Sequence, residues 1–86
     1  MNKEFTFYSD PGHGWLKVSV NDVLSIGLLP ADFSECSYRD GSILYLEEDC
    51  DAPMFIKAWD ARGNSHTFKE VYESQKSFIR NLPSIW

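Results

Sequence analysis

The sequence has few of the residues on which disulfide-rich proteins, nucleic-acid binders and membrane proteins depend. Only two of its 86 residues are cysteines, Cys36 and Cys50, too few for a disulfide framework. Eight Lys and Arg stand against thirteen Asp and Glu, so the net charge is −5 and no general nucleic-acid binding is expected. No apolar run approaches the roughly 20 residues of a membrane span, and the first residues lack the apolar stretch of a signal peptide. We therefore expect a cytoplasmic protein with no membrane partner and two free thiols in its core, a Cys36–Cys50 bridge being the alternative.

Aromatic and aliphatic residues are plentiful by contrast. Hydrophobic residues make up 43% of the chain and aromatic residues 15%, which is enough to close one hydrophobic core. A chain of 86 residues is too short for two domains, so we predict one domain over residues 1–86. Trp15 and Trp59 fall in predicted elements and are expected in the core. Trp86 is terminal and is expected to be an exposed aromatic anchor for a partner.

The pattern of apolar residues predicts a small α+β domain. Alternation favours strands at 5–8, 15–18, 36–39, 42–46 and 66–72. Helical spacing and capping residues favour helices between Ser19 and Gly27 and between Asp51 and Gly63. The order ββαββαβ predicts a mostly antiparallel sheet of about five strands with two helices. Residues 74–86 are expected to form either a docked or an exposed tail.

The Asp40-Gly41 dipeptide is typical of a two-residue hairpin turn. Such a turn pairs Arg39 with Ser42 and places Tyr38 opposite Ile43. Leu44 and Leu46 lie on the other side of this strand, so we expect it to be covered on both faces.

The negative charge is concentrated in the middle of the chain, where residues 31–61 carry eight acids and two bases. Four of these acids precede the second predicted helix: Glu47, Glu48, Asp49 and Asp51. Their spacing does not match a calcium loop, and spacing alone leaves a catalytic carboxylate pair undetermined. Acids before a helix complement its dipole, and they also form a surface for a basic partner.

Three further combinations of histidine and cysteine residues are candidate sites. His13 lies between two glycines in a predicted turn, where an exposed imidazole suits acid–base chemistry, yet the sequence places no partner beside it. His13, His66, Cys36 and Cys50 lack the short spacing of zinc modules, so we expect no metal and no cofactor. A Cys50–His66–Asp triad has no supporting motif either.

The C-terminal third is mildly basic and contains aromatic residues. Its bases are Arg62, Lys69, Lys76 and Arg80, and its aromatic residues include Phe78 and Trp86. This composition suits either a solvated face or stacking on single-stranded nucleic acid, and repulsion from the acidic middle opposes the second.

Two segments carry a family resemblance. Tyr8–Val18 reads YSDPGHGWLKV and Tyr45–Asp51 reads YLEEDCD, and in this order they resemble small uncharacterised proteins of bacteriophages and plasmids. The resemblance covers roughly residues 5–62 and supplies no catalytic residue. It implies a context in which small acidic proteins bind and block a host machine, as anti-CRISPR and anti-restriction inhibitors do.

We therefore expect a non-catalytic inhibitor acting in the bacterial cytoplasm as a monomer or homodimer. Its partner would be a host protein or a protein–nucleic-acid complex. The residues expected to bind it are Glu47, Glu48, Asp49, Asp51 and Trp86. One alternative is a small enzyme or ligand-modifying factor that uses His13 with Cys50 or an acid. Another is a structural or regulatory module that self-associates through its tail.

Overall fold

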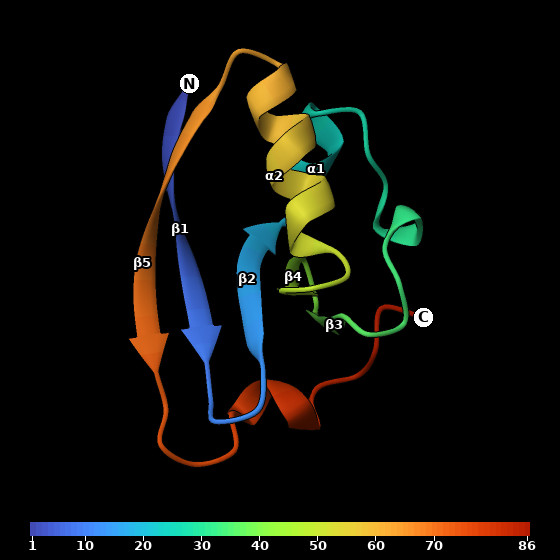
Figure 1. Ribbon diagram of the computed structural model, residues 1–86. Helices are drawn as coiled ribbons and strands as arrows, with labels where there is room; N and C mark the ends of the chain where they lie inside the picture. Colours follow the sequence, from blue (N-terminus) through green and yellow to red (C-terminus); the bar gives the residue numbers. More distant parts are fainter.

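The computed structural model describes residues 1–86 and confirms the α+β prediction. A five-stranded sheet has the spatial order β3-β4-β2-β1-β5 and carries helices on one face (Figure 1). The strands are β1 (Asn2–Ser9), β2 (Gly14–Ser19), β3 (Tyr38–Asp40), β4 (Ile43–Glu47) and β5 (Ser65–Tyr72). The helices are α1 (Val20–Ser25) and α2 (Ala52–Ala61), with short 3-10 helices η1 (Pro30–Asp32) and η2 (Phe78–Asn81). None of these helices is long and apolar enough to cross a membrane.

Three of the four strand pairings are antiparallel, and the pairing of β1 with β5 is parallel. Helix α2 carries the chain from β4 across one face of the sheet, so β5 starts beside the start of β1 and runs in the same direction. Phe5 of β1 lies opposite Phe68 of β5. Strand β5 is an edge strand, and most of its side chains are exposed.

The main core lies between the sheet and α2. Phe55 and Trp59, one helical turn apart on α2, both pack edge-on against Phe5 of β1, at ring-centroid distances of 5.3 and 5.2 Å. All three side chains are buried. The predicted apolar stripe of α2 therefore faces the sheet, and Trp59 is a core residue as expected.

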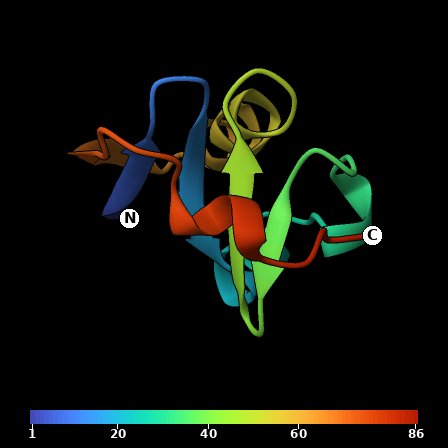
Figure 2. The ribbon, with the colours of Figure 1, turned by 90° about the horizontal axis from the view of Figure 1, so that it is seen from below.

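A second, smaller core lies on the opposite face of the sheet. Trp15, Tyr45 and Ile79 are its buried members, and Ile79 comes from η2, which crosses this face (Figure 2). The tail is also tied to β3, because the N–H of Arg39 donates to the carbonyl of Pro83. Residues 74–86 are thus a docked tail that closes the second face.

The predicted register of the β3–β4 hairpin is wrong. Tyr38 pairs with Tyr45 rather than Ile43, and Asp40 pairs with Ile43, so the turn residues are Gly41 and Ser42. This register places Tyr38 beside Trp15, with ring centroids 6.3 Å apart, in the second core. Side-chain packing therefore overrides the local turn preference.

Strand β4 is covered on both faces, as its sequence predicted. Leu44 and Leu46 belong to the main core, whereas Tyr45 belongs to the second core. The predicted cap of α1 is also present, because the Ser19 hydroxyl accepts a hydrogen bond from the N–H of Asp22.

Candidate functional site

The loop between β1 and β2 is organised by a buried carboxylate, Asp10. Its Oδ1 accepts hydrogen bonds from the N–H groups of Gly12 and His13, each 3.0 Å long. Its Oδ2 accepts from the N–H of Ser77, and the guanidinium of Arg80 donates to both oxygens at 2.7 and 2.8 Å. The bonds from Arg80 hold the pKa of Asp10 well below its usual range, so this carboxylate stays ionised. The backbone of His13 is thereby fixed against η2.

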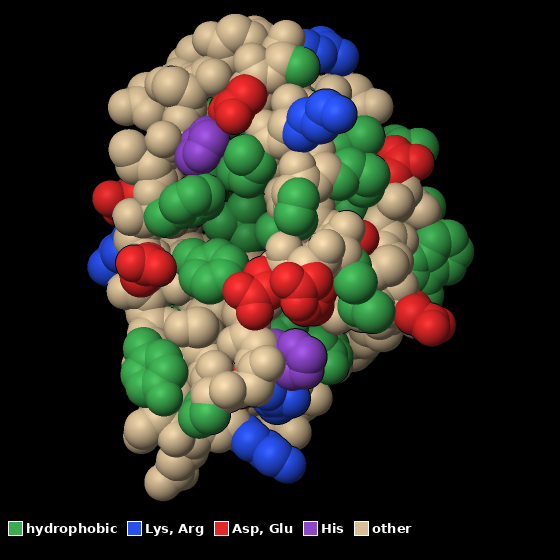
Figure 3. Space-filling model, in the orientation of Figure 1, with side chains coloured by type: hydrophobic (Ala, Val, Ile, Leu, Met, Phe, Trp, Pro, Cys, Tyr) green, Lys and Arg blue, Asp and Glu red, His purple; other side chains and the backbone are tan.

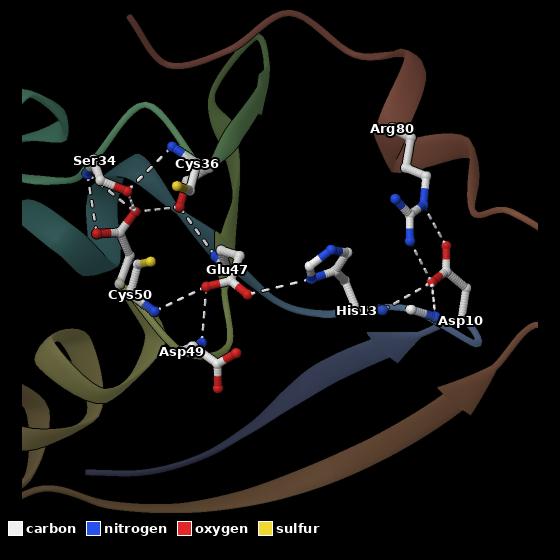
Figure 4. Close-up of polar contacts among 11 residues, drawn as sticks. Asp10, His13, Ser34, Cys36, Glu47, Asp49, Cys50 and Arg80 are labelled. Atoms are coloured by element: carbon white, nitrogen blue, oxygen red, sulfur yellow. Dashed lines mark hydrogen bonds and ion pairs between the residues drawn. The ribbon is translucent and has the colours of Figure 1, made fainter.

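The turn between β4 and α2 is organised by a second carboxylate, Glu47. Its Oε2 accepts hydrogen bonds of 2.8 Å from the N–H groups of Asp49 and Cys50. Its Oε1 lies 3.7 Å from Nδ1 of His13, which brings the β1–β2 loop and this turn together (Figure 4). The Glu47 side chain is buried. It shapes the turn from inside and does not form part of an exposed surface.

Asp51 is buried as well, so it cannot belong to the exposed acidic surface that the sequence predicted. Its carboxylate accepts hydrogen bonds from the backbone and hydroxyl of Ser34 and from the hydroxyl of Ser37. The Ser37 hydroxyl in turn accepts from the N–H of Glu47 at 3.0 Å. Asp51 occupies the N-cap position of α2 but makes no capping bond with its side chain. These serines, unremarkable in the sequence, make its burial tolerable.

Glu48 and Asp49 are the two acids of this turn that are exposed. Their carboxylate oxygens and one of Glu47 lie within 4.8 Å of one another, which concentrates negative charge at one point of the surface. The N–H of Glu48 donates to the carbonyl of Gly14 and anchors the turn to β2. We call Glu48 and Asp49 the acidic pair.

A pocket of about 390 Å³ opens where the loop and the turn meet. We call it the His13 pocket. Aromatic side chains of Trp15 and Tyr38 form part of its wall, and Arg80 and Asp49 border it. The rest of its lining consists of four residues with titratable side chains: His13, Cys36, Glu47 and Cys50. Nε1 of Trp15 is buried and has no hydrogen-bond partner.

The two cysteines are free, as expected, but they are exposed rather than part of the core. The turn folds around the Glu47 carboxylate, which directs Cys50 outward, toward the pocket. Hydrogen bonds from its thiol to Glu47 and to Cys36 raise the pKa of Cys50 to about 11. Its thiol is therefore protonated at neutral pH, whereas a nucleophilic cysteine requires the thiolate.

The other histidine lies elsewhere. His66 of β5 contacts Asp60 of α2 through Nδ1 at 2.8 Å and does not line the pocket. The structure therefore does not assemble the Cys50–His66–Asp triad.

Two of these C-terminal residues, Arg80 and Phe78, make contacts within the molecule. Arg80 is paired with Asp10, and its guanidinium lies 5.3 Å from the ring of Trp15. Phe78 packs edge-on against Tyr8 and Tyr45, at 5.7 and 5.8 Å. Both side chains serve the docking of the tail.

A second concavity lies between α2 and β5. It has a volume of about 380 Å³ and is lined mainly by apolar side chains of Phe7, Leu16, Ala52, Pro53, Ile56 and Phe68. Glu48 and Glu70 complete its lining. Figure 3 shows hydrophobic side chains gathered on this face with acidic side chains along their border. We call it the apolar groove.

No family model, curated protein or solved structure matches this chain.

Trp86 is the fifth residue that the sequence predicted to bind a partner. The Trp86 residue is 69% exposed, although its indole N–H donates to the carbonyl of Phe33. The five residues predicted to bind a partner therefore divide into two buried acids, two exposed acids and one exposed tryptophan.

Proposed function

We propose that this protein belongs to a phage or another mobile genetic element and is a non-catalytic inhibitor that binds a host protein through the apolar groove and the acidic pair. The observation that carries the proposal is the position of Glu48. It is one of the exposed acids of the β4–α2 turn, and it also lines the apolar groove. Negative charge and apolar contact area therefore form one continuous surface.

Such a surface suits a basic partner with an apolar contact site. The groove supplies contact area that binding would remove from water, the term that drives most protein association. The carboxylates attract and orient a positively charged surface, such as one that normally binds nucleic acid phosphates. A host protein with a basic surface for nucleic acid has this chemistry. A protein–nucleic-acid complex with a free basic channel has it as well.

The turn that presents the acidic pair is held in place before any partner arrives. Glu47 accepts bonds from the backbone of Asp49 and Cys50, and Glu48 is tied to Gly14 of β2. A preformed surface loses little conformational entropy on binding, which favours affinity.

The pocket chemistry gives less support to the enzyme alternative. The structure brings His13 to an acid, Glu47, but the 3.7 Å between them is too long for a hydrogen bond. Cys50 is held as a neutral thiol. If an enzyme activity did exist, it would use His13, and His13→Ala would abolish it while the fold survived.

The proposal is tested by affinity purification from a bacterial host with two matched charge reversals. Glu48→Lys with Asp49→Lys alters the acidic pair, and Glu35→Lys with Asp40→Lys changes the net charge equally at two other exposed acids. We expect the first variant to lose roughly tenfold or more in affinity for the captured host protein, and the second to bind as the wild type does.

Two further measurements assign the mode of binding. Ile56→Glu, which places a charge in the apolar groove, should weaken capture as the acidic-pair variant does. Added duplex DNA or RNA should compete with the protein for a partner that normally binds phosphates. Equal capture by the two charge-reversal variants would reject the proposed surface.

A further inference from the structure

The two edges of the sheet differ in what covers them. Along β3 the C-terminal tail covers the edge: the N–H of Arg39 donates to the carbonyl of Pro83, and Tyr38 and Ser84 form an antiparallel bridge. The opposite edge is β5, Ser65–Tyr72, and no segment of the chain lies along its outer side (Figure 1). An open edge strand is a template for pairing with another chain, so β5 is a candidate interaction surface.

The backbone groups of β5 that are free to pair follow from its bonds to β1. The N–H of Ser65 donates to the carbonyl of Met1, and the N–H of Glu73 donates to the carbonyl of Ser9. The register between these two bonds is continuous. Because the backbone groups of successive strand residues point to alternate sides, the odd-numbered residues bond to β1. The N–H and C=O groups of residues 66, 68, 70 and 72 therefore point outward, and no hydrogen bond outside the helices and the sheet involves these backbone groups.

The side chains of the same even-numbered residues lie on the face of the sheet that α2 covers. Phe68 and Glu70 line the apolar groove beside α2, and Nδ1 of His66 contacts Asp60 of that helix. Tyr72 lies on this face by alternation. Phe68 and Tyr72 are exposed large aromatic residues. The edge thus combines unpaired backbone groups with exposed aromatic rings.

A second copy of β5 can pair with this edge in antiparallel orientation, about a two-fold axis perpendicular to the sheet. Such an axis keeps the α2 faces of both copies on one side, so even-numbered residues lie opposite even-numbered ones. The two registers with the longest overlap are centred on Phe68, over residues 65–71, and on Lys69, over residues 66–72. The second places Lys69 opposite Lys69, and like charges directly opposite each other are destabilising.

The register centred on Phe68 is self-complementary. It places Phe68 opposite Phe68 and His66 opposite Glu70 on the α2 face, and Lys69 opposite Thr67 on the other face. Aromatic pairs and pairs of an imidazole with a carboxylate stabilise neighbouring strands. His66, Phe68 and Glu70 also have the outward backbone groups, so each of these opposite pairs can exchange both of its backbone hydrogen bonds. The charges of this edge therefore select a register for pairing.

We propose that β5 is a homodimer interface, in which β5 of one copy pairs antiparallel with β5 of a second copy in the register centred on Phe68. The two sheets then form one continuous sheet, with both α2 helices and both apolar grooves on the same face. The interface requires neither the tail nor the acidic pair. It does not depend on whether the protein inhibits a host factor.

The first test is the oligomeric state of the full reduced chain alone, measured by sedimentation equilibrium up to about 1 mM. We expect a monomer–dimer equilibrium without larger species, because the tail covers the other edge of each sheet. In hydrogen exchange followed by NMR, the N–H groups of His66, Phe68 and Glu70 should exchange more slowly as the dimer forms. The N–H of Tyr72 should not change, since its opposite position, 64, lies outside β5.

Disulfide trapping measures the register, in a chain that also carries Cys36→Ser and Cys50→Ser. Phe68→Cys should form an intermolecular disulfide on mild oxidation, because position 68 lies opposite itself. Glu70→Cys is the matched control on the same face. Its two copies would lie about 13 Å apart along the strands, too far for a disulfide.

Two substitutions at Glu70 separate backbone pairing from side-chain contact. Glu70→Pro removes an outward N–H that makes no bond to β1, and it should weaken the dimer roughly tenfold or more. Glu70→Ala keeps this N–H and loses only the contact with His66, so it should weaken the dimer a few-fold at most. Circular dichroism establishes that both variants fold.

A chain that stays monomeric at about 1 mM would overturn the proposal. If the same N–H groups were slowed only in a complex with a host protein, the edge would belong to that partner and the homodimer would be rejected. Equal disulfide formation by Phe68→Cys and Glu70→Cys would reject the register. A dimer unaffected by Glu70→Pro, or one that dissociates in Trp86→Ala, would place the interface elsewhere.

Discussion

Arg80 donates two hydrogen bonds to the carboxylate of Asp10, a residue 70 positions earlier in the chain. The side chain of Asp10 is completely buried, and that of Arg80 is 29% exposed. Asp10 also accepts from the backbone of Ser77, so one carboxylate joins the β1–β2 loop to the docked tail. Both the His13 pocket and the second core depend on this joint, because Arg80 borders the first and Ile79 belongs to the second.

Asp10→Asn should destabilise the protein in a pH-dependent way. The pKa of Asp10 in the folded protein lies below the ordinary value of 3.8, so its ionised form stabilises the fold above about pH 4. This contribution is lost as the pH falls toward the folded pKa. In urea unfolding, the difference between wild type and Asp10→Asn should therefore be large at neutral pH and shrink at about pH 2.5.

Asp40→Asn provides the control for Asp10→Asn, since Asp40 is exposed and its substitution removes the same negative charge. Its unfolding free energy should follow the wild type at both pH values. A stability difference for Asp10→Asn that is independent of pH would contradict the assigned role of its charge.

Ser37→Ala should destabilise the β4–α2 turn. The fully buried Ser37 hydroxyl donates to Asp51 and accepts from the N–H of Glu47, so its removal leaves two buried groups short of a partner. We expect a loss of about 1–3 kcal/mol in the free energy of unfolding, measured with urea. Ser34→Ala should lose less, because Ser34 is less buried and its backbone N–H still donates to Asp51.

Gly14→Ala should disturb both the sheet and the acidic pair. A Cβ at this position would lie 2.5 Å from Cζ of Phe7 and 3.0 Å from Oε2 of Glu48, so the Phe7 ring must move. Overpacking of this kind costs about 1–3 kcal/mol. At Gly12 the added Cβ would lie 2.8 Å from Nη2 of Arg80, which would have to shift in its pairing with Asp10, but it would meet no ring and no backbone, so Gly12→Ala should destabilise less. Thermal unfolding of the two variants compares them, and the opposite order would contradict this packing.

Ile79→Ala should show that the tail is part of the fold. Ile79 is fully buried in the second core, and its truncation should remove about 2–5 kcal/mol of stability. Trp86→Ala, at an exposed position, should cost less than Ile79→Ala in the same urea titration. Light scattering on both variants addresses the self-association alternative: an oligomer that dissociates in Trp86→Ala would favour it.

Features that depend on a few neighbouring residues could be predicted from the sequence. The strand alternation, the Ser19 cap of α1 and the apolar stripe of α2 are set by contacts within one or two turns of chain, and all three are present. The coverage of β4 on both faces also followed from its leucines and Tyr45. The predicted register of the β3–β4 hairpin was wrong. The preference of Asp40-Gly41 for the turn is small in energy, and the packing of Tyr38 against Trp15 outweighs it.

The sequence by itself determined one acidic α+β domain and placed negative charge ahead of the second helix. Only the tertiary structure decided which of those charges face solvent: Glu47 and Asp51 are turned inward by backbone and serine donors, whereas Glu48 and Asp49 remain exposed. It also decided that His13, Cys36 and Cys50 share a pocket. The local periodicity of apolar residues is enough to predict the fold class. Which side chains from distant segments come together depends on how the whole chain packs, and this cannot be predicted from spacing in the sequence.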